Sequence, residues 1–195
     1  MSSRSWPREL WAWTTTRLLL PRVGVLWLLL MGVSHHTSEA ALLVTLLIAQ
    51  FRLWDDLADR RHDGHHHPQR VLVTSVHGGY FGMLCVAAAA PVLLLLWGAP
   101  VEVAVYVLLC LGIASVYSAD AALPRLLRAQ LVLLKYAVFA WLAGASVALG
   151  LGLWLALAVY EMYSDATLQT SRCWRALAGA QILGLLVLAS IFTIS

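Results

Sequence analysis

The chain has 195 residues, of which 61% are hydrophobic and 12% are charged, and its mean hydropathy is +0.79. Soluble domains carry about 25% charged residues, so this composition excludes an ordinary soluble protein and predicts an integral membrane protein. Twelve Arg and one Lys give a net charge of +3. In a membrane protein this excess indicates orientation and contact with anionic lipid of the bilayer rather than nucleic-acid binding.

The apolar residues fall into stretches near the ~20 residues that a transmembrane helix needs. Residues 1–17 alternate Trp with Arg and predict an interfacial segment at the lipid headgroups. The predicted spans are 18–33, 39–57, 75–97, 101–117, 129–149, 151–165 and 176–194. We expect tight turns at 34–38, 98–100 and 150–152, and polar loops at 58–70, 118–128 and 166–175. The expected fold is all-α: one transmembrane domain, residues 1–195, built as a polytopic bundle of about seven spans.

The cationic residues test this layout. All thirteen lie at the N-terminus or in and beside the three polar loops, and the three tight turns contain none. The positive-inside rule makes the side that carries them cytoplasmic. We therefore expect the N-terminus inside and the C-terminus outside, in a bacterial cytoplasmic (inner) membrane.

A dense acidic cluster ends the second predicted span. Asp55, Asp56, Asp59 and Asp63 are four of the ten acidic residues, and they fall within nine positions. On a helix, Asp56, Asp59 and Asp63 share one face. Clustered carboxylates repel one another unless cations hold them, so the cluster predicts a metal site, and hard oxygen ligands favour Mg²⁺.

A second acidic pair ends the sixth predicted span. Glu161 and Asp165 are spaced i, i+4 on one helical face and lie on the same side of the membrane as the first cluster. A bundle can bring the two clusters together around one cavity, where they would bridge two Mg²⁺ ions and a diphosphate. The alternative is that these carboxylates are solvated helix ends.

These motifs resemble those of the UbiA superfamily of intramembrane prenyltransferases. Asp55-Asp56-x-x-Asp59-x-x-x-Asp63 is similar to that family's NDxxDxxxD motif, with Asp55 in place of Asn. Glu161-x-x-x-Asp165 looks like its second motif, DxxxD. Further likenesses are His67-Pro68-Gln69-Arg70 after the first motif, and Tyr117-Ser118 ahead of Arg125 and Arg128.

The resemblance implies that a prenyl diphosphate binds through Mg²⁺, ionises to an allylic carbocation and prenylates a lipophilic acceptor, aromatic or lipid-like. By that likeness Asp56, Asp59 and Asp63 would hold one metal, and Glu161 and Asp165 the other. The residues expected to contact diphosphate or substrate are Asp55, Arg60, Arg70, Tyr117, Arg125, Arg128 and Lys135. Lys135 also stands out by its depth in the fifth span, where an ammonium needs an anionic partner unless it snorkels to the interface.

Alternative interpretations remain open at this point. The family usually has nine spans, so a seven-span chain could be a shortened relative that binds metal or diphosphate without catalysis, or a homo-oligomer that completes its bundle by pairing. A CDP-alcohol phosphotransferase is less well supported, because no Ala-Arg follows Asp63-Gly64. The histidines at positions 62 and 65–67 can bind a transition metal or form a solvated loop.

Overall fold

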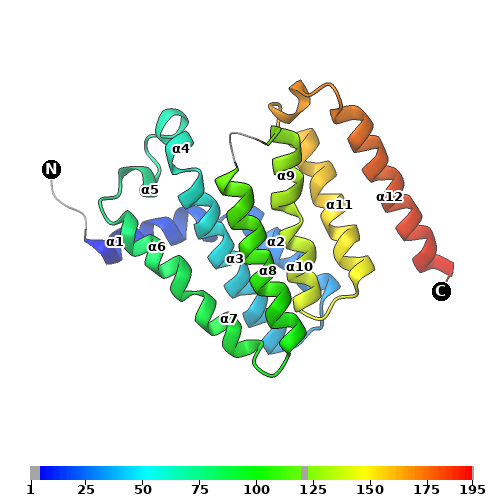
Figure 1. The fold of residues 1–195 in the computed structure, drawn as a ribbon, viewed down its shortest axis with the longest axis horizontal. Coiled ribbons are helices and arrows are strands. Elements are labelled where there is room, and N and C mark those ends of the chain that lie inside the picture. The colour runs from blue at the N-terminus through cyan, green and yellow to red at the C-terminus, as the bar shows by residue number, and fades with distance from the viewer. Residues whose placement is uncertain (1–4, 120–122, 195) are drawn as a thin grey trace.

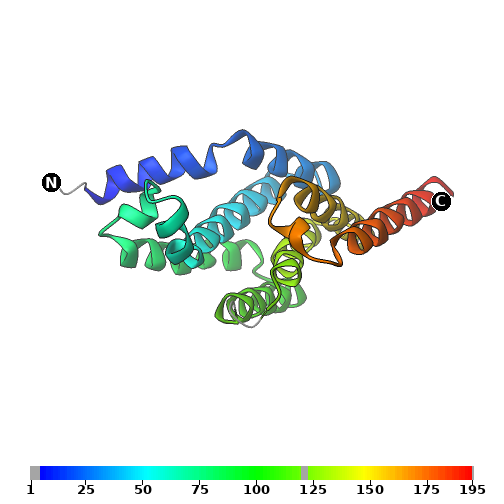
Figure 2. The ribbon, with the colours of Figure 1, turned by 90° about the horizontal axis from the view of Figure 1, so that it is seen from above.

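The computed structural model describes residues 5–119 and 123–194, without the side chains of residues 61–62 and 192–194. The described part is helical throughout and contains no strand (Figure 1). Its elements in order are α1 (Trp6–Trp13), the π-helix η1 (Thr14–Leu18), α2 (Pro21–Val33), α3 (Ser38–Ala58), α4 (Arg60–His66), α5 (Val71–Thr74), α6 (Gly78–Ala87), α7 (Ala89–Leu95), α8 (Pro100–Ser118), α9 (Arg125–Leu133), α10 (Lys135–Leu142), α11 (Val147–Ser164), the 3₁₀ helix η2 (Leu168–Thr170) and α12 (Trp174–Ile194). Both ribbon views place the N-terminal segment at one end of the molecule and α12 at the other (Figures 1 and 2).

Several of these helices are long and apolar enough to cross a membrane. Four pass on length and composition: α6 with α7, α8, α11 and α12. A fifth is added if the segment from α1 to η1 and α2, which meet at a bend of 64°, count as one broken span. Only 11–22% of the residues in the four spanning windows are buried inside the protein. Their apolar side chains therefore face outward, as helices in lipid require.

Two other predicted spans correspond to helices that are less apolar or shorter than a transmembrane helix. The second, 39–57, is the 21-residue α3, whose charged residues Glu39, Arg52, Asp55 and Asp56 lower its hydropathy. The fifth, 129–149, is divided between α9 and α10 at Leu134. The count of seven spans stays a prediction.

Two connections differ from expectation. Residues 150–152 were predicted to be a turn, but the chain turns at Gly144, whose φ of +93° suits a residue without Cβ. Ser146 then caps α11 by accepting a 3.2 Å hydrogen bond from Leu149 N. Gly150 lies inside α11, where a Cβ would stand 2.8 Å from the carbonyl oxygen of Ala137, so this glycine serves close helix packing. Likewise the predicted loop 58–70 is largely helical, because α4 continues the chain after α3.

The predicted span 75–97 is broken into α6 and α7. Pro91 lies in the first turn of α7 and has no N–H with which to bond the carbonyl of Ala87. The helix therefore ends at Ala87 and restarts at Ala89, with Ala88 as the shared cap.

The main core lies where α2, α3, α7, α8, α10 and α11 meet. Phe51 and Phe139 are almost fully buried there and pack edge to face with ring centroids 5.1 Å apart. A second cluster, centred on Trp13 and Phe81, fixes the N-terminal segment against α3 and α6. Glu9 strengthens this contact, because it accepts a 2.5 Å hydrogen bond from Ser75 Oγ and lies 3.0 Å from His77 Nδ1.

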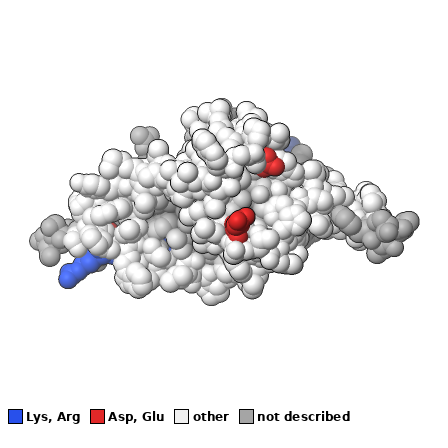
Figure 3. Space-filling model, turned by 90° about the horizontal axis from the view of Figure 1, so that it is seen from below, with Lys and Arg blue, Asp and Glu red and all other residues white. Residues whose placement is uncertain are grey.

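Charged side chains are unevenly distributed over the surface. The face that includes the turns after α7 and after α10 shows few of them (Figure 3). Both acidic clusters lie toward the other end of the bundle, where α3 and α11 end (Figure 1).

Candidate functional site

A cavity of about 760 Å³ is bounded by residues of α2, α3, α10 and α11. Its apolar wall is made by Leu20, Val23, Leu26, Ile48, Phe51, Leu133, Phe139 and Leu157. Its charged side chains are Arg17, Arg22, Arg52, Asp59, Asp63, Arg70, Lys135, Glu161 and Asp165. Asp59 and Asp63 of the first acidic cluster and both members of the second thus face one space, and that space also has apolar residues suited to a hydrocarbon chain.

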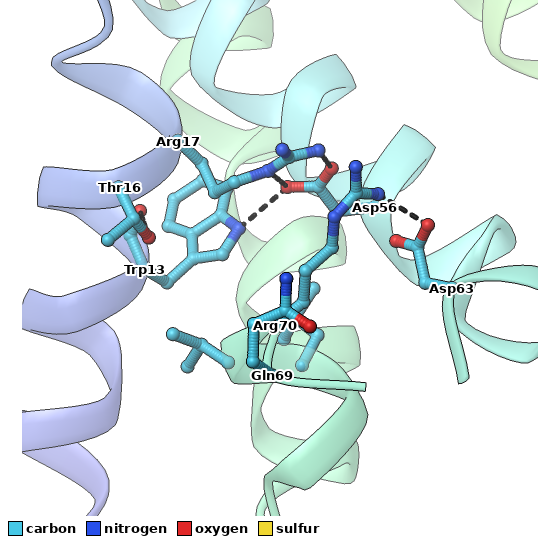
Figure 4. A pocket seen from close by; sticks show the side chains of 9 residues that line it. Trp13, Thr16, Arg17, Asp56, Asp63, Gln69 and Arg70 are labelled. Atoms are coloured by element: carbon cyan, nitrogen blue, oxygen red, sulfur yellow. Dashed lines mark hydrogen bonds and ion pairs between the residues drawn. The ribbon is translucent and has the colours of Figure 1, made fainter. Parts of the chain in front are cut away.

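Asp56 is held by the N-terminal segment. Trp13 Nε1 donates a 2.9 Å hydrogen bond to Asp56 Oδ2, and Arg17 donates to both carboxylate oxygens, from Nε at 2.8 Å and from Nη2 (Figure 4). The Asp56 residue is only 6% exposed, so its negative charge needs these donors. The fork of Arg17 matches a carboxylate in both charge and shape, and it ties η1 to the end of α3.

Asp63 forms an ion pair with Arg70, which lies seven residues later in the chain, between α4 and α5 (Figure 4). Both residues line the large cavity and also a smaller cavity of about 210 Å³. Arg17 lines both cavities as well, whereas Asp56 lines only the smaller one. These two ion pairs therefore form part of the wall between the two spaces.

Asp55 binds two groups that come from distant parts of the chain. Lys135 Nζ lies 2.5 Å from its Oδ2, and the Tyr117 hydroxyl donates to its Oδ1. Lys135 is 1% exposed. The ammonium is thus buried and does not reach out to the interface. Its anionic partner, which its depth in the predicted span led us to expect, is Asp55 of the first acidic cluster.

Asp59, at the junction of α3 and α4, pairs with Arg128 of α9 at 3.2 Å. The Asp59 side chain is 47% exposed, so this pair contributes less to stability than a buried pair would. Arg128 also lies over the ring of Tyr117, 5.6 Å from its centroid. Every carboxylate of the first cluster therefore has a cationic partner, and the four cations come from four different elements or loops.

The second acidic cluster is different. Glu161 and Asp165 line the large cavity, and neither forms an ion pair with another residue in the described part of the chain. Asp165 Oδ1 accepts hydrogen bonds from Thr167 N at 2.8 Å and Thr167 Oγ1 at 2.7 Å, which shapes the turn after α11. Glu161 lies on the last turn of α11, and its carboxylate has no such local bond among the described residues.

The predicted site residues divide by position. Those that line the large cavity are Asp59, Asp63, Arg70, Lys135, Glu161 and Asp165. Those outside its lining are Asp55, Asp56, Arg60, Tyr117, Arg125 and Arg128. Of the second group, Arg60 donates from Nη2 to the carbonyl oxygen of Ser75 at 3.0 Å, and Arg125 is exposed at the start of α9.

Sequence reasoning missed three arginines that line the large cavity. Arg17 falls within the segment 1–17 that was predicted to be interfacial, and Arg22 falls within the predicted span 18–33, so neither was assigned to the site. Arg52 precedes Asp55 and Asp56 by one helical turn, on the same helical face. That spacing favours a local ion pair, which the described structure does not form, and it does not place Arg52 in the large cavity, because Asp55 and Asp56 lie outside the lining to which Arg52 belongs.

The described residues include no group of three or more His, Cys, Asp or Glu side chains that could hold a metal ion by themselves. The oxygen donors on the cavity wall nevertheless suit Mg²⁺ in kind. Mg²⁺ in phosphate-binding sites is usually held by one or two carboxylates together with phosphate oxygens and water, rather than by a complete protein cage. Glu161 with Asp165 fits that donor set.

Comparisons of this chain with models of protein families, with curated proteins and with solved structures find no match in any of the three. The functional conclusion therefore depends on the chemistry of the cavity and on its two acidic clusters.

Proposed function

We propose that this protein is a Mg²⁺-dependent intramembrane prenyltransferase that moves an isoprenyl group from a prenyl diphosphate to a lipophilic acceptor. The observation that carries the proposal is the composition of one cavity. It combines carboxylates of both acidic clusters, several cations and eight apolar side chains from α2, α3, α10, α11 and their neighbouring residues. A prenyl diphosphate has the matching parts: a highly charged diphosphate and a long hydrocarbon chain.

The charged residues in and beside the cavity have distinct roles in this proposal. Glu161 and Asp165 would hold one Mg²⁺, and Asp59 and Asp63 a second; bound there, the metal withdraws charge from the diphosphate leaving group. Asp56 would act through Arg17, which it holds in the wall of both cavities. Lys135, which is buried and paired with Asp55, would add positive charge to the wall of the same cavity.

In the reaction the allylic C–O bond breaks and its electron pair leaves with the diphosphate. The acceptor then forms a new bond to the allylic carbon and loses a proton. The chain's own contribution is to bind the diphosphate, to hold the isoprenyl group along the apolar wall and to keep water from the carbocation. Phe51 and Phe139 close that wall with tightly packed rings.

The proposal includes a membrane arrangement. In a UbiA-like bundle of seven spans, α3 and the α9–α10 pair cross in addition to the apolar helices, and the bundle lies in a bacterial inner membrane. The N-terminus is then cytoplasmic and the C-terminus external, which puts both acidic clusters at the cytoplasmic side. The sparse charge on the opposite face supports this orientation (Figure 3).

Turnover in lipid nanodiscs tests the proposal. Purified protein is incubated with geranylgeranyl diphosphate, Mg²⁺ and a panel of quinone-type, aromatic and glycerophosphate acceptors, and both diphosphate release and prenylated product are measured. We expect product with the unmodified chain and at least a hundredfold less with Glu161→Gln. Glu39→Gln is the matched control, because Glu39 is an exposed glutamate at the far end of α3.

Two outcomes oppose the proposal. If the protein binds diphosphate but never releases it from an allylic substrate, the non-catalytic shortened relative becomes the better description. If Glu161→Gln leaves turnover unchanged, the second acidic cluster has no part in the chemistry.

A further inference from the structure

Arg52 and Arg22 are the basic residues of the cavity that form no ion pair with a described residue, although both attract the Glu161 carboxylate, which lines the same cavity. Arg17, Arg70 and Lys135 each form an ion pair with a carboxylate of the first cluster. Arg52 Nε is buried without a hydrogen-bond partner, and no ion pair joins this side chain to another described residue. Buried donors are almost always satisfied, so the orphaned Nε shows that the hydrogen bonding of Arg52 is incomplete within the described chain, and the residue also lines the cavity.

Arg22 adds a second unpaired cation to the same cavity. It lies in the first turn of α2, is exposed, and forms no hydrogen bond or ion pair with a residue that the structure describes. Arg22 and Arg52 come from different helices, and both line the cavity. Arg22 and Arg52 thus present positive charge to this space from two helices, and the Glu161 carboxylate of the second cluster lies within their electrostatic reach.

Arg52 stands at the boundary between the charged and apolar parts of the wall. Its neighbour Phe51 and the preceding turn, at Ile48, belong to the apolar wall, whereas Asp55 and Asp56 lie one turn toward the polar end. An anion bound to Arg52 would therefore lie at the point where an attached hydrocarbon chain could continue along Ile48 and Phe51.

We propose that Arg52, assisted by Arg22, is the principal binding residue for the diphosphate of the substrate. The inference rests on the proposed function, which it deepens by assigning the phosphate contact to residues that carry no structural ion pair. A guanidinium presents parallel N–H donors that match two phosphate oxygens, and Arg17, Arg70 and Lys135 are already engaged by Asp side chains. Phosphate of a diphosphate and phosphate of an anionic lipid share this chemistry, so the test separates the two sources.

The test measures binding of inorganic diphosphate by calorimetry to the full chain in phosphatidylcholine nanodiscs, first with EDTA and then with Mg²⁺. We expect Arg52→Gln to weaken binding at least tenfold in both conditions, and Arg22→Gln to weaken it about threefold. Arg52→Lys keeps the charge but loses the fork, so its affinity should lie between those of Arg52→Gln and the unmodified chain. Arg8→Gln is the control, because Arg8 is an exposed arginine of α1 outside the cavity, and its affinity should stay within twofold.

A second arm tests the lipid source with nanodiscs that contain phosphatidylglycerol and with native mass spectrometry of retained lipid. If the unmodified chain retains phosphatidylglycerol through Arg52 and binds no diphosphate, a lipid headgroup is the occupant and the proposal is overturned. Diphosphate affinity of Arg52→Gln within twofold of the unmodified chain also overturns it, as does the absence of any anion binding.

The outcomes also separate this inference from the proposed function. If diphosphate binding depends on Arg52 but no prenyl transfer is detected, Arg52 is supported as the diphosphate-binding residue and the prenyltransferase proposal is rejected. If Arg52→Gln transfers the prenyl group with the same KM as the unmodified chain, the prenyltransferase proposal is supported and Arg52 does not contact the substrate. Thermal unfolding of each variant checks that Arg52→Gln retains the fold.

Discussion

The two acidic clusters of this protein are built in opposite ways. In the first, Asp55, Asp56, Asp59 and Asp63 are each paired with a cation from elsewhere in the chain. In the second, Glu161 and Asp165 face the cavity without an ion pair among the described residues. Pairing gives the first cluster a structural role, because it joins segments of the fold, and Asp59 and Asp63 would hold a metal in addition to that role; the second cluster has only the cavity to serve.

The first cluster joins the segments. Its partners come from η1, α9, α10 and the loop before α5. We therefore expect substitutions there to cost stability first, and substitutions in the second cluster to cost ligand binding with little change in stability. Three substitutions test this expectation, and they are given in order of decreasing expected loss of stability.

Lys135→Met should give the largest loss. It leaves the Asp55 carboxylate without its ammonium at a site where Lys135 is 1% exposed, and breaking such a buried pair costs about 3–5 kcal/mol. The free energy of unfolding is measured by denaturant titration in detergent micelles. The double variant with Asp55→Asn should recover part of the loss, and additive effects of the two changes would contradict the pairing.

Arg17→Gln should have an intermediate effect. It removes a bidentate partner from Asp56, at a cost of about 1–3 kcal/mol. Hydrogen exchange should rise in α1 and η1, because this pair and Trp13 fix the N-terminal segment to α3. Arg8→Gln removes an exposed charge from the same segment and should leave exchange unchanged. Equal exchange in both variants would mean that apolar packing alone holds the segment.

Asp165→Asn should have the smallest effect on stability, within about 0.5 kcal/mol. Asn keeps the Oδ1 acceptor that Thr167 uses, so the turn after α11 is retained. The strengthening of diphosphate binding by Mg²⁺ should nevertheless fall at least tenfold, as measured by calorimetry. A large loss of stability with unchanged Mg²⁺ dependence would make the second cluster structural, like the first.

Much of the fold could be predicted where a helix is uniformly apolar. The predicted span 101–117 is observed as Pro100–Ser118. The role of a glycine was harder to predict from the sequence, because it can depend on a neighbouring helix. Gly150 lies within α11, where it allows close packing on Ala137, and does not form the predicted turn. The break before Pro91 likewise follows from one missing hydrogen bond in an otherwise continuous apolar stretch.

The site was predictable in its acidic residues but not in its pairings. Spacing along a helix indicates which carboxylates share a face, yet the partners Lys135 and Arg17 lie 80 and 39 residues from their aspartates. Such contacts depend on how helices pack, which local spacing does not encode. Arg52 was missed for a different reason: an arginine one turn from two aspartates suggests a local ion pair, and the described structure forms none.

The contact between η1 and Asp56 has a consequence for the order of biosynthesis. Arg17 leaves the ribosome 39 residues before its acceptor does, a delay of roughly 2–8 s at translation rates of about 5–20 residues per second. In the proposed membrane arrangement, the first helix therefore has to wait at the membrane surface until α3 has been delivered. Its interspersed Trp and Arg side chains suit the headgroup region and would supply a temporary attachment there during this interval.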